Sequence, residues 1–285
     1  MPGKALRIAL PNKGSLSAAA TEILREAGYR QRNDAKQLTL SDPENDVEFF
    51  YLRPRDIALY VGEGTLDLGI TGRDLMLDSG AKAEEVLPLG FGRSRFRFAA
   101  PAGTVSVLSD LNGKRVATSY DGVVRRYLEE NGIDATVTRL DGAVETSVQL
   151  GVADVIADVV ETGSTLRQAG LEIVCDTILE SEAVLIRRAG AETPVGFEVF
   201  ERRVQGVLVA RSYVMMDYDI RVERVDEAVA ITPGIESPTV SPLHREGWVA
   251  VRSMVPRAAA QRIMDDLWEI GGRGILVTEI NACRL

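Results

Sequence analysis

Residues 145–166 read ETSVQLGVADVIADVVETGSTL and contain a predicted strand, turn and helix start, in that order. Residues 153–160 form a short apolar run, which is typical of a buried strand. The run contains one acid, Asp158. Small and hydroxyl-bearing residues follow as a turn: Thr162, Gly163, Ser164 and Thr165. The next letters, LRQAGLE, begin like a helix. A strand that leads through a tight turn into a helix is the repeating unit of an α/β fold.

This turn is suited to binding a phosphate. The unpaired N–H groups of a first helical turn and the positive end of the helix dipole both favour an anion. Gly163 lets the backbone approach closely, and the neighbouring hydroxyls add hydrogen-bond donors. The Asp158 carboxylate, just upstream, can hold sugar hydroxyls or a magnesium ion. The pattern therefore indicates a ribose-phosphate site, and the alternative is a threonine that caps the helix of an ordinary loop.

The first 210 residues alternate predicted strands with predicted helices. Strands are expected at residues 7–10, 47–52, 66–71, 96–100, 115–118, 135–140, 154–159 and 181–188. Helices are expected at residues 15–27, 54–61, 123–131 and 143–150, after the turn at 162–165, and up to about residue 210. This alternation favours parallel sheets, and because the pattern restarts near Gly92 we expect two α/β lobes with a ligand cleft between them.

From residue 213 the order changes to strand, helix, strand, strand, helix, strand. The six elements are expected at residues 213–218, 222–230, 239–242, 248–255, 258–270 and 275–280. This order is ferredoxin-like. The predicted domains are residues 1–92 with 182–211, residues 93–181, and residues 212–285.

Composition excludes several classes of protein. The chain has 285 residues and a net charge of −9, which argues against a general nucleic-acid binder. Arg93, Arg95 and Arg97 alternate as the basic face of one strand, which is either a solvated edge strand or binds a polyphosphate. An apolar export leader and a stretch of membrane-spanning length are both missing from the sequence, so we expect a cytoplasmic protein with no membrane partner.

The chain has few cysteine and histidine side chains for catalysis or metal binding. Cys175 and Cys283 lack the paired spacing of a zinc site and fit a reducing compartment. His244 is the single histidine and lies in the loop sequence SPLHREGW. Catalysis by a serine–histidine or cysteine–histidine pair, or by a metal bound to several histidines, would have to use this one residue. We expect instead that His244 is an exposed loop residue.

The phosphate turn is part of a longer pattern that resembles a known family. The matching residues are Glu145, Gly151, Ala153, Ile156, Asp158, Thr162, Gly163, Thr165 and Leu166. They resemble the signature of ATP phosphoribosyltransferase, the first enzyme of histidine biosynthesis. The stretches LPNKGSLS, FFYLRPRDIALYV, LGITGRDL and LDGAVETSVQLG are also similar to that family. From about Tyr213 the chain resembles the regulatory domain of the family's long form.

The resemblance implies a fold, a reaction and a set of partners. The fold would be a bilobal periplasmic-binding-protein-like core with a C-terminal ferredoxin-like (ACT-like) domain. The enzyme would join ring nitrogen one of ATP to the anomeric carbon of phosphoribosyl pyrophosphate and release pyrophosphate, with Mg²⁺ as cofactor. Histidine would inhibit it through the C-terminal domain, in a homo-oligomer with dimer and hexamer forms and no separate regulatory subunit.

Site residues follow from the matching motifs. The ribose 5′-phosphate would lie on Thr162, Gly163, Ser164 and Thr165, with Asp158 on the ribose hydroxyls. Lys13 would contact pyrophosphate, unless it is only a solvated lysine. Glu145 would orient or deprotonate the adenine amino group, unless it only favours a helix dipole. The ATP residues would be Arg53, Arg73, Asp74 and Tyr120. The metal ligands are left open, with Asp158 or Glu145 as candidates through the substrate pyrophosphate.

Purely structural roles remain possible for the residues that match less specific motifs. Arg73 and Asp74 can pair with partners elsewhere, and Tyr120 can be a core tyrosine rather than a stacking partner of adenine. For histidine binding the candidates are Asp219, Ile235, Ser237 and Thr239. Asp219 is favoured over Asp217, and the alternative is that all of them are turn residues.

Two other classes of protein deserve comparison. A solute-binding protein shares bilobal α/β sheets without chemistry, but it would carry an export signal. A ligand-sensing regulator would join a sensor domain to a binding core, but it would need a DNA-binding element or a basic stripe. Release of pyrophosphate from phosphoribosyl pyrophosphate in the presence of ATP separates the enzyme from both.

Overall fold

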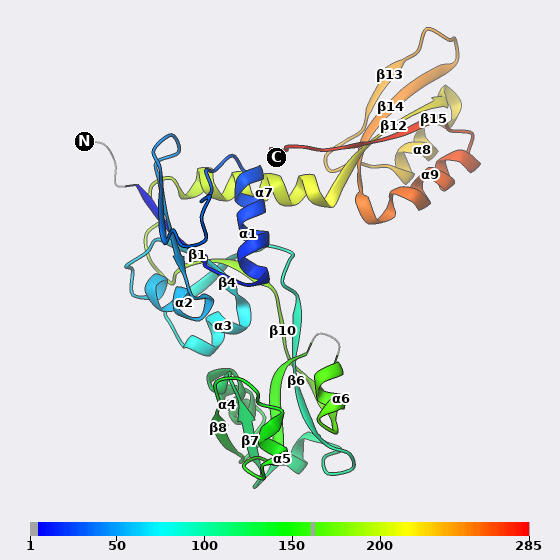
Figure 1. Ribbon diagram of the computed structural model, residues 1–285. Coiled ribbons are helices and arrows are strands. Elements are labelled where there is room, and N and C mark those ends of the chain that lie inside the picture. The colour runs from blue at the N-terminus through cyan, green and yellow to red at the C-terminus, as the bar shows by residue number, and fades with distance from the viewer. Residues whose placement is uncertain (1–4, 161–162, 285) are drawn as a thin grey trace. The chain divides into compact units, whose positions relative to one another are not determined.

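The computed structural model describes residues 5–160 and 163–284 (Figure 1). The chain divides into two compact units, Met1–Glu22 with Arg30–Phe197, and Ile23–Tyr29 with Glu198–Leu285. The first unit contains a six-stranded and a five-stranded sheet, and the second contains a four-stranded sheet. Within the described residues, no helix has both the length and the apolar character needed to span a bilayer.

The six-stranded sheet has the order β2-β3-β1-β4-β11-β5. Its parallel centre consists of β1 (Leu6–Pro11), β3 (Val47–Leu52) and β4 (Leu68–Gly72). The antiparallel strands are β2 (Thr39–Asp42), β5 (Ala83–Pro88) and β11 (Ala183–Arg188). Helices α1 (Ser15–Glu26), α2 (Pro54–Gly62) and α3 (Arg73–Ser79) each follow a parallel strand. We call this sheet, with α2 and α3, lobe I.

The five-stranded sheet has the order β10-β6-β9-β7-β8. Strands β7 (Arg115–Thr118), β8 (Thr136–Arg139) and β9 (Val155–Val160) are parallel, whereas β6 (Ser94–Pro101) and β10 (Leu171–Ser181) are antiparallel. The helical segments are η1 (Leu108–Leu111), α4 (Asp121–Glu130), α5 (Thr146–Gln149) and α6 (Ser164–Gln168). We call this sheet and these helices lobe II.

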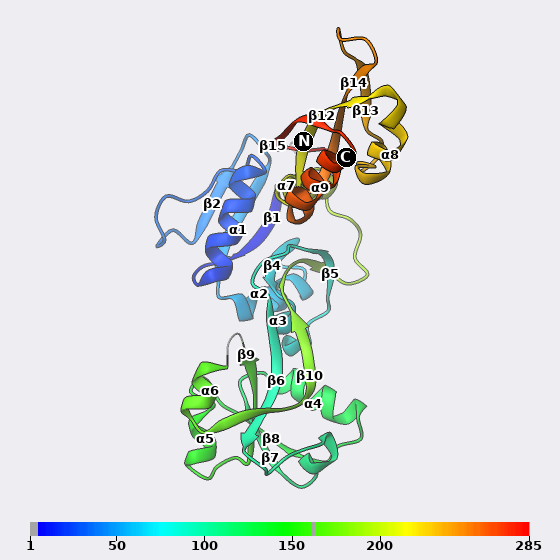
Figure 2. The same cartoon turned by 90° about the vertical axis from the view of Figure 1, so that its right-hand side faces the viewer.

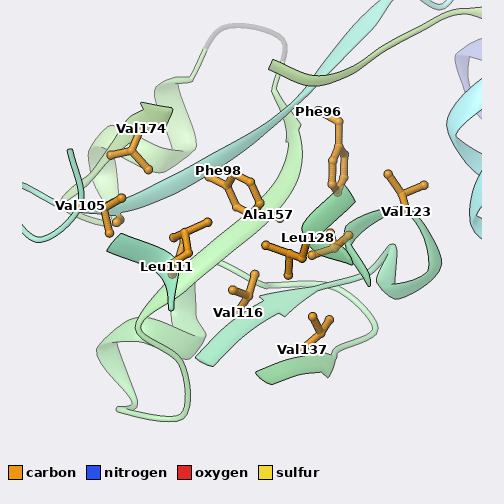
Figure 3. Close-up of a cluster of buried hydrophobic side chains, with 13 residues drawn as sticks. Phe96, Phe98, Val105, Leu111, Val116, Val123, Leu128, Val137, Ala157 and Val174 are labelled. Atoms are coloured by element: carbon orange, nitrogen blue, oxygen red, sulfur yellow. The ribbon is translucent and has the colours of Figure 1, made fainter. Parts of the chain in front are cut away.

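The core of lobe II lies on both faces of its sheet. Phe96 and Phe98 of β6 enter the cluster shown in Figure 3, together with Leu111, Val116 and Leu128. Ala99, the next residue along β6, packs with Ile156 on the opposite face. This alternation is the period of two that a central strand requires, and burying one such phenylalanine contributes about 1.5–3 kcal/mol.

Strands β6 and β10 lie side by side (Figure 2), and their register shows that β10 carries extra residues. Val174 pairs with Phe98 and Leu179 with Phe96, so residues 175–178 bulge, and Cys175 has φ of 58°. The Arg97 guanidinium donates to Thr177 Oγ1 and to the Cys175 carbonyl oxygen, both at 3.0 Å. One arginine of the predicted basic face therefore holds a bulge, and β6 is an interior strand of its sheet rather than an edge strand.

The second unit contains the sheet β13-β14-β12-β15, in which every neighbouring pair is antiparallel. The strands are β12 (Tyr213–Arg221), β13 (Thr239–Pro242), β14 (Trp248–Pro256) and β15 (Arg273–Glu279). Short 3₁₀ turns, Val222–Arg224 and Arg257–Ala259, lead into α8 (Val225–Ile231) and α9 (Ala260–Glu269), and α7 (Phe197–Ser212) precedes the sheet. The predicted ferredoxin-like order is confirmed.

Several elements differ from the sequence prediction. Both large sheets are mixed rather than parallel. Four elements were not predicted: β2, β5, β10 and α3. The helix expected at residues 143–150 is wrong in extent, because α5 covers only Thr146–Gln149 and Ala143 before it has φ of 46°, which no right-handed helix allows.

Candidate functional site

Asp158 lies near the carboxyl end of β9, and its side chain is half-buried. Burial raises the pKa of this carboxyl group, the Val159 N–H at 2.8 Å opposes that rise, and the negative charge of Glu145 adds to it. Glu145 is half-buried and stands at the start of α5. The structure therefore brings two of the predicted site acids, Asp158 and Glu145, within electrostatic reach of each other.

The phosphate turn is partly described. Thr162 lies outside the described residues. Gly163 precedes α6 with φ of 69°, a left-handed conformation that glycine adopts without strain. Ser164 is the first residue of α6, and Thr165 follows it with an exposed side chain. The backbone thus enters a short helix directly after β9, as the sequence predicts.

Three predicted residues of lobe I follow the carboxyl ends of adjacent parallel strands. Lys13, exposed, lies between β1 and α1, and Arg53, also exposed, lies between β3 and α2. The Asn12 N–H donates to the Leu52 carbonyl oxygen at 2.8 Å, so the two loops leave the sheet side by side. Asp74 is buried in the first turn of α3 after β4, and its N–H donates to Ser181 Oγ at 3.0 Å. These groups share one edge of the sheet, where ligands of open α/β sheets bind.

Arg73 is already paired in the structure. Its Nε and Nη2 donate to the two carboxylate oxygens of Glu85 at 2.8 Å each, and Nη2 lies 3.5 Å from Glu182 Oε1. The hydrogen bonds to Glu85 raise the pKa of Arg73. Of the two uses considered for this side chain, the structure shows the ion pair.

Tyr120 ends the loop after β7 and precedes α4. Its ring meets Phe96 edge-on, with centroids 5.2 Å apart, and Arg55 Cζ lies 5.0 Å from the ring centroid. Burial raises the pKa of the Tyr120 phenol, and the charges of Asp74 and Asp158 raise it further. The phenol is therefore close to acids from both lobes, and the ring is partly covered by protein groups of its own.

Two residues that were not selected from the sequence are at the Lys13 loop: Asn12 belongs to it, and Arg32 contacts it. The Asn12 Oδ1 atom is buried and accepts no hydrogen bond from any described residue. Arg32 donates to the Asn12 carbonyl oxygen at 2.7 Å and places Cζ 3.9 Å from the Tyr51 ring centroid. Arg32 comes from the polar stretch before β2, which carries no periodic signal, so only the fold reveals its proximity.

The C-terminal candidates spread over one sheet face and a loop. Asp219 alternates with the buried Tyr218 and Ile220, so it faces away from the hydrophobic core. Arg252 of β14 lies opposite Thr239 of β13 on one side and opposite Asp217 of β12 on the other. Asp217 is two residues from Asp219, so all four side chains share the face that points away from the core. Arg252 Nε lies 2.6 Å from Asp217 Oδ1, so Asp217 is engaged in an ion pair.

The other two C-terminal candidates lie before β13. Ile235 is 37% exposed and Ser237 is exposed, both in the loop between α8 and β13. His244 is exposed in the turn between β13 and β14, as the sequence predicts. Among the described residues, no group of three or more histidine, cysteine, aspartate or glutamate side chains is arranged to hold a metal ion.

Comparisons with known proteins cover nearly the whole chain. A family model described as "HisG: ATP phosphoribosyltransferase" matches residues 53–206, and "HisG, C-terminal domain" matches residues 210–282. The ATP phosphoribosyltransferase of Streptomyces avermitilis is 65% identical over 284 residues, which cover 98% of this chain and 100% of that protein. That of Arthrobacter sp. is 64% identical over 285 residues, with the same coverage of both chains.

A solved structure agrees with the fold. It is a chain of the ATP phosphoribosyl transferase (HisG:HisZ) complex from Thermotoga maritima, with 27% identity and a TM-score of 0.59. The match covers 71% of this chain and 98% of that chain. The family expected from the motifs is confirmed: the chain belongs to the ATP phosphoribosyltransferase family, whose enzymes are transferases that perform the first step of histidine biosynthesis.

Proposed function

We propose that this enzyme joins ring nitrogen one of the adenine of ATP to the anomeric carbon of phosphoribosyl pyrophosphate. The N–C bond forms as the bond from that carbon to the pyrophosphate oxygen breaks, and the adenine amino group gives up a proton. The observation that carries this proposal is the conjunction of Asp158 and Glu145 beside the β9–α6 turn, in a chain 65% identical to a named ATP phosphoribosyltransferase.

The ribose end would be held by lobe II. Asp158 would accept hydrogen bonds from the ribose hydroxyls, and the backbone of Gly163, with Thr162, Ser164 and Thr165, would receive the 5′-phosphate. Left-handed backbone at Gly163, directly before the first turn of α6, supports this, since such a turn leaves the first N–H groups of the helix without partners inside the helix. A neutral nucleophile and a charged leaving group need positioning and electrostatic stabilisation rather than a protein nucleophile.

The nucleotide and the leaving group would be held mainly by lobe I. Lys13 and Arg53 are exposed on adjacent loops, and we assign them to pyrophosphate and to the ATP triphosphate. Arg73 would reach a phosphate only by exchanging Glu85 for it, so its role in ATP binding is secondary. Asp74 and Tyr120 would contact the nucleotide, and Glu145 would orient the adenine amino group or accept its proton.

The donor set also fits a magnesium ion. Asp158 and Glu145 are oxygen ligands whose negative charges already repel each other, and a cation bound with pyrophosphate would relieve that repulsion. The ion would neutralise charge that develops on the leaving group. Either carboxylate would serve as the protein ligand.

The C-terminal domain would bind histidine as an inhibitor. Asp219 would meet the ligand's amino group, and Ser237 or Thr239 its imidazole or carboxylate, beside Ile235. Because the match to the family's C-terminal domain spans residues 210–282, we propose that this domain takes the regulatory role and that the chain needs no separate regulatory subunit. Inhibition would act by shifting the population of dimer and hexamer forms in the cytoplasm.

The test is pyrophosphate release by the purified chain with ATP, phosphoribosyl pyrophosphate and Mg²⁺, with and without histidine. We expect turnover that histidine suppresses, and a product whose mass is the sum of ATP and a phosphoribosyl group. Asp158→Asn should lower kcat/KM by about a hundredfold, whereas Asp141→Asn, at a side chain 89% exposed, should not change it. Absence of pyrophosphate from the wild-type chain contradicts the reaction.

The histidine site needs its own pair of variants. Asp219→Asn should abolish inhibition without changing turnover in the absence of histidine. Asp217→Asn, on the same sheet face but paired with Arg252, should retain inhibition. Inhibition that persists in Asp219→Asn removes this residue from the site.

A further inference from the structure

Asp78, near the end of α3 in lobe I, is a buried acid that contacts lobe II. Its side chain is only 5% exposed. One carboxylate oxygen, Oδ2, accepts a hydrogen bond from Arg55 Nη1 of α2 at 2.7 Å. The other, Oδ1, accepts from the backbone N–H groups of Gly122 and Val123 at 2.9 and 3.4 Å. A single carboxylate therefore joins two helices of lobe I to the first turn of α4 in lobe II.

Asp78 gives α4 a capping acceptor that the preceding residue of lobe II does not provide. The first N–H groups of a helix have no partner inside the helix, and a side chain near its start usually accepts one of them. Tyr120 precedes α4, and its side chain makes no capping hydrogen bond to the described first turn. Asp78 provides that acceptor, together with a negative charge at the positive end of the helix dipole.

The backbones of the two lobes also approach closely at this point. A Cβ atom at Gly122 would lie 2.4 Å from the Asp78 carbonyl oxygen, far inside van der Waals contact. Gly122 does not have positive φ, so the turn itself does not require glycine. What requires glycine here is the nearness of α3. A second contact lies one turn along α4, where Arg126 Nη2 donates to the Leu77 carbonyl oxygen at 3.3 Å.

The same contact lies beside the groups that we assign to substrate. Arg55, the ion-pair partner of Asp78, also places its guanidinium over the Tyr120 ring at 5.0 Å. Burial raises the pKa of the Tyr120 phenol, with further contributions from Asp74 of lobe I and Asp158 of lobe II. In the orientation that Asp78 holds, the charges of acids from both lobes therefore act on one phenol.

We propose that Asp78 is a positioning residue which, with Arg55 and Gly122, latches lobe I to lobe II in the orientation that binds both substrates. Lys13, Arg53 and Asp74 lie on one lobe, whereas Tyr120, Glu145 and Asp158 lie on the other. Loss of the latch reduces the fraction of molecules in the binding orientation, and the apparent dissociation constants of both substrates rise by the same factor. This inference rests on the proposed substrates, but the distance between the lobes tests it without them.

The first experiment measures that distance directly. Spin labels would replace Glu63, exposed after α2, and Glu129, exposed on α4, in a chain carrying Cys175→Ser and Cys283→Ser. Double electron–electron resonance then compares the parent with Gly122→Ala and with Asp78→Asn. We expect both variants to move the distribution to longer distances or broaden it, because one inserts a methyl group between the lobes and the other removes the ion pair.

The second experiment measures steady-state kinetics of the same variants without labels. We expect KM for ATP and for phosphoribosyl pyrophosphate to rise together by about 3- to 30-fold, while kcat at saturation stays within about threefold, as a shift in population requires. Asp110→Asn is the matched control. Asp110 accepts two backbone N–H groups, from Ser106 and Val107 at 2.8 and 3.1 Å, entirely within lobe II. Its loss should lower the melting temperature but change neither the distance nor either KM.

A purely local role for Asp78 makes the opposite prediction. Alanine is a better helix former than glycine, so Gly122→Ala would stabilise α4 and leave the lobes in place, and Asp78→Asn would lower only the melting temperature. An unchanged distance in both variants overturns the latch. Should Gly122→Ala fail to fold, the distance in Asp78→Asn decides alone. Absence of turnover in the wild-type chain would refute the proposed reaction and leave the distance result standing.

Discussion

Arg211, in the last turn of α7, donates two hydrogen bonds to the Glu26 carboxylate, at 2.9 Å from Nε and 2.8 Å from Nη2. Glu26 is the last residue of α1, a helix that begins at Ser15 just after the Lys13 loop. The Arg211 carbonyl oxygen in turn accepts from Arg257 Nε at 2.9 Å, and Arg257 also pairs with Glu279 of β15. Within the second unit, the end of α1 is thus tied through α7 to the C-terminal sheet.

The Glu26–Arg211 pair should give a small and pH-dependent stabilisation. The hydrogen bonds from Arg211 lower the pKa of Glu26 below its ordinary value of 4.5. A depressed carboxyl pKa stabilises the folded state above pH 4.5, and this contribution disappears as the pH falls through the folded-state pKa. Since both side chains are about one-third exposed, Glu26→Gln should cost at most about 1 kcal/mol at pH 7.

The measurement is urea unfolding at pH 7 and at pH 3.5, in a cycle with Arg211→Gln. The difference between wild type and Glu26→Gln should shrink at the lower pH. A difference that is the same at both values shows that the charge of Glu26 does not contribute.

Asp158 should behave in the opposite sense. Burial and Glu145 raise its folded-state pKa, so the ionised carboxylate destabilises the fold above that pKa. Asp158→Asn should therefore raise the melting temperature at pH 7 while it lowers activity. The gain should vanish as the pH falls below 3.8, the ordinary pKa of an aspartate, where both proteins are neutral at this position. Melting curves across that range check the sign, and a gain that persists at low pH refutes it.

Removing the charge of Glu145 should change the titration of Asp158. Because Glu145 raises the pKa of that carboxyl group, Glu145→Gln should move the acid limb of the kcat/KM profile to lower pH. Asp141→Gln in the same loop serves as the control and should leave the limb in place. An unshifted limb in Glu145→Gln means that the ionisation of Asp158 does not govern activity.

Gly163→Ala should cost stability through backbone conformation alone. The nearest atoms to a Cβ at this position are 3.8 Å away, so there is room, but φ of 69° costs an alanine about 1–2 kcal/mol. If the following N–H groups hold the 5′-phosphate, KM for phosphoribosyl pyrophosphate should also rise by about tenfold.

Gly151→Ala is the matched variant, with φ of 70° and open space around it. Chemical denaturation should give both variants the same loss of stability, and only Gly163→Ala should change KM. Equal KM values in the two variants contradict the phosphate assignment.

The sequence predicts the elements whose signals are local. Strand β3 matches its prediction to the residue, because alternating burial and the flanking Pro54 define it. Strand β13 also matches to the residue, between turn residues on both sides. Strands β2 and β5 were missed since their sequences, TLSD and AEEVLP, become strands only by pairing with neighbours distant in sequence.

The candidate site divides in the same way. The β9–α6 turn and the strand ends near Lys13 and Arg53 follow from contiguous motifs. The ion pair of Arg73 with Glu85 does not, because it depends on how β5 lies against the sheet. The role of Asp78 could not be predicted either. Nothing in the sequence LMLDSG indicates that this acid accepts hydrogen bonds from the first turn of α4, a helix that begins at Asp121.

The position of β11 has a consequence for the order in which the chain can fold. This strand lies between β4 and β5, yet it is synthesised after all of lobe II. Until residues 183–188 leave the ribosome, β4 and β5 both present open edges, which are prone to pairing with other chains. Lobe II is contiguous in sequence and has no such gap. We therefore expect nascent chains to complete lobe II first, and to depend on chaperones until β11 pairs with β4 and β5 in the six-stranded sheet.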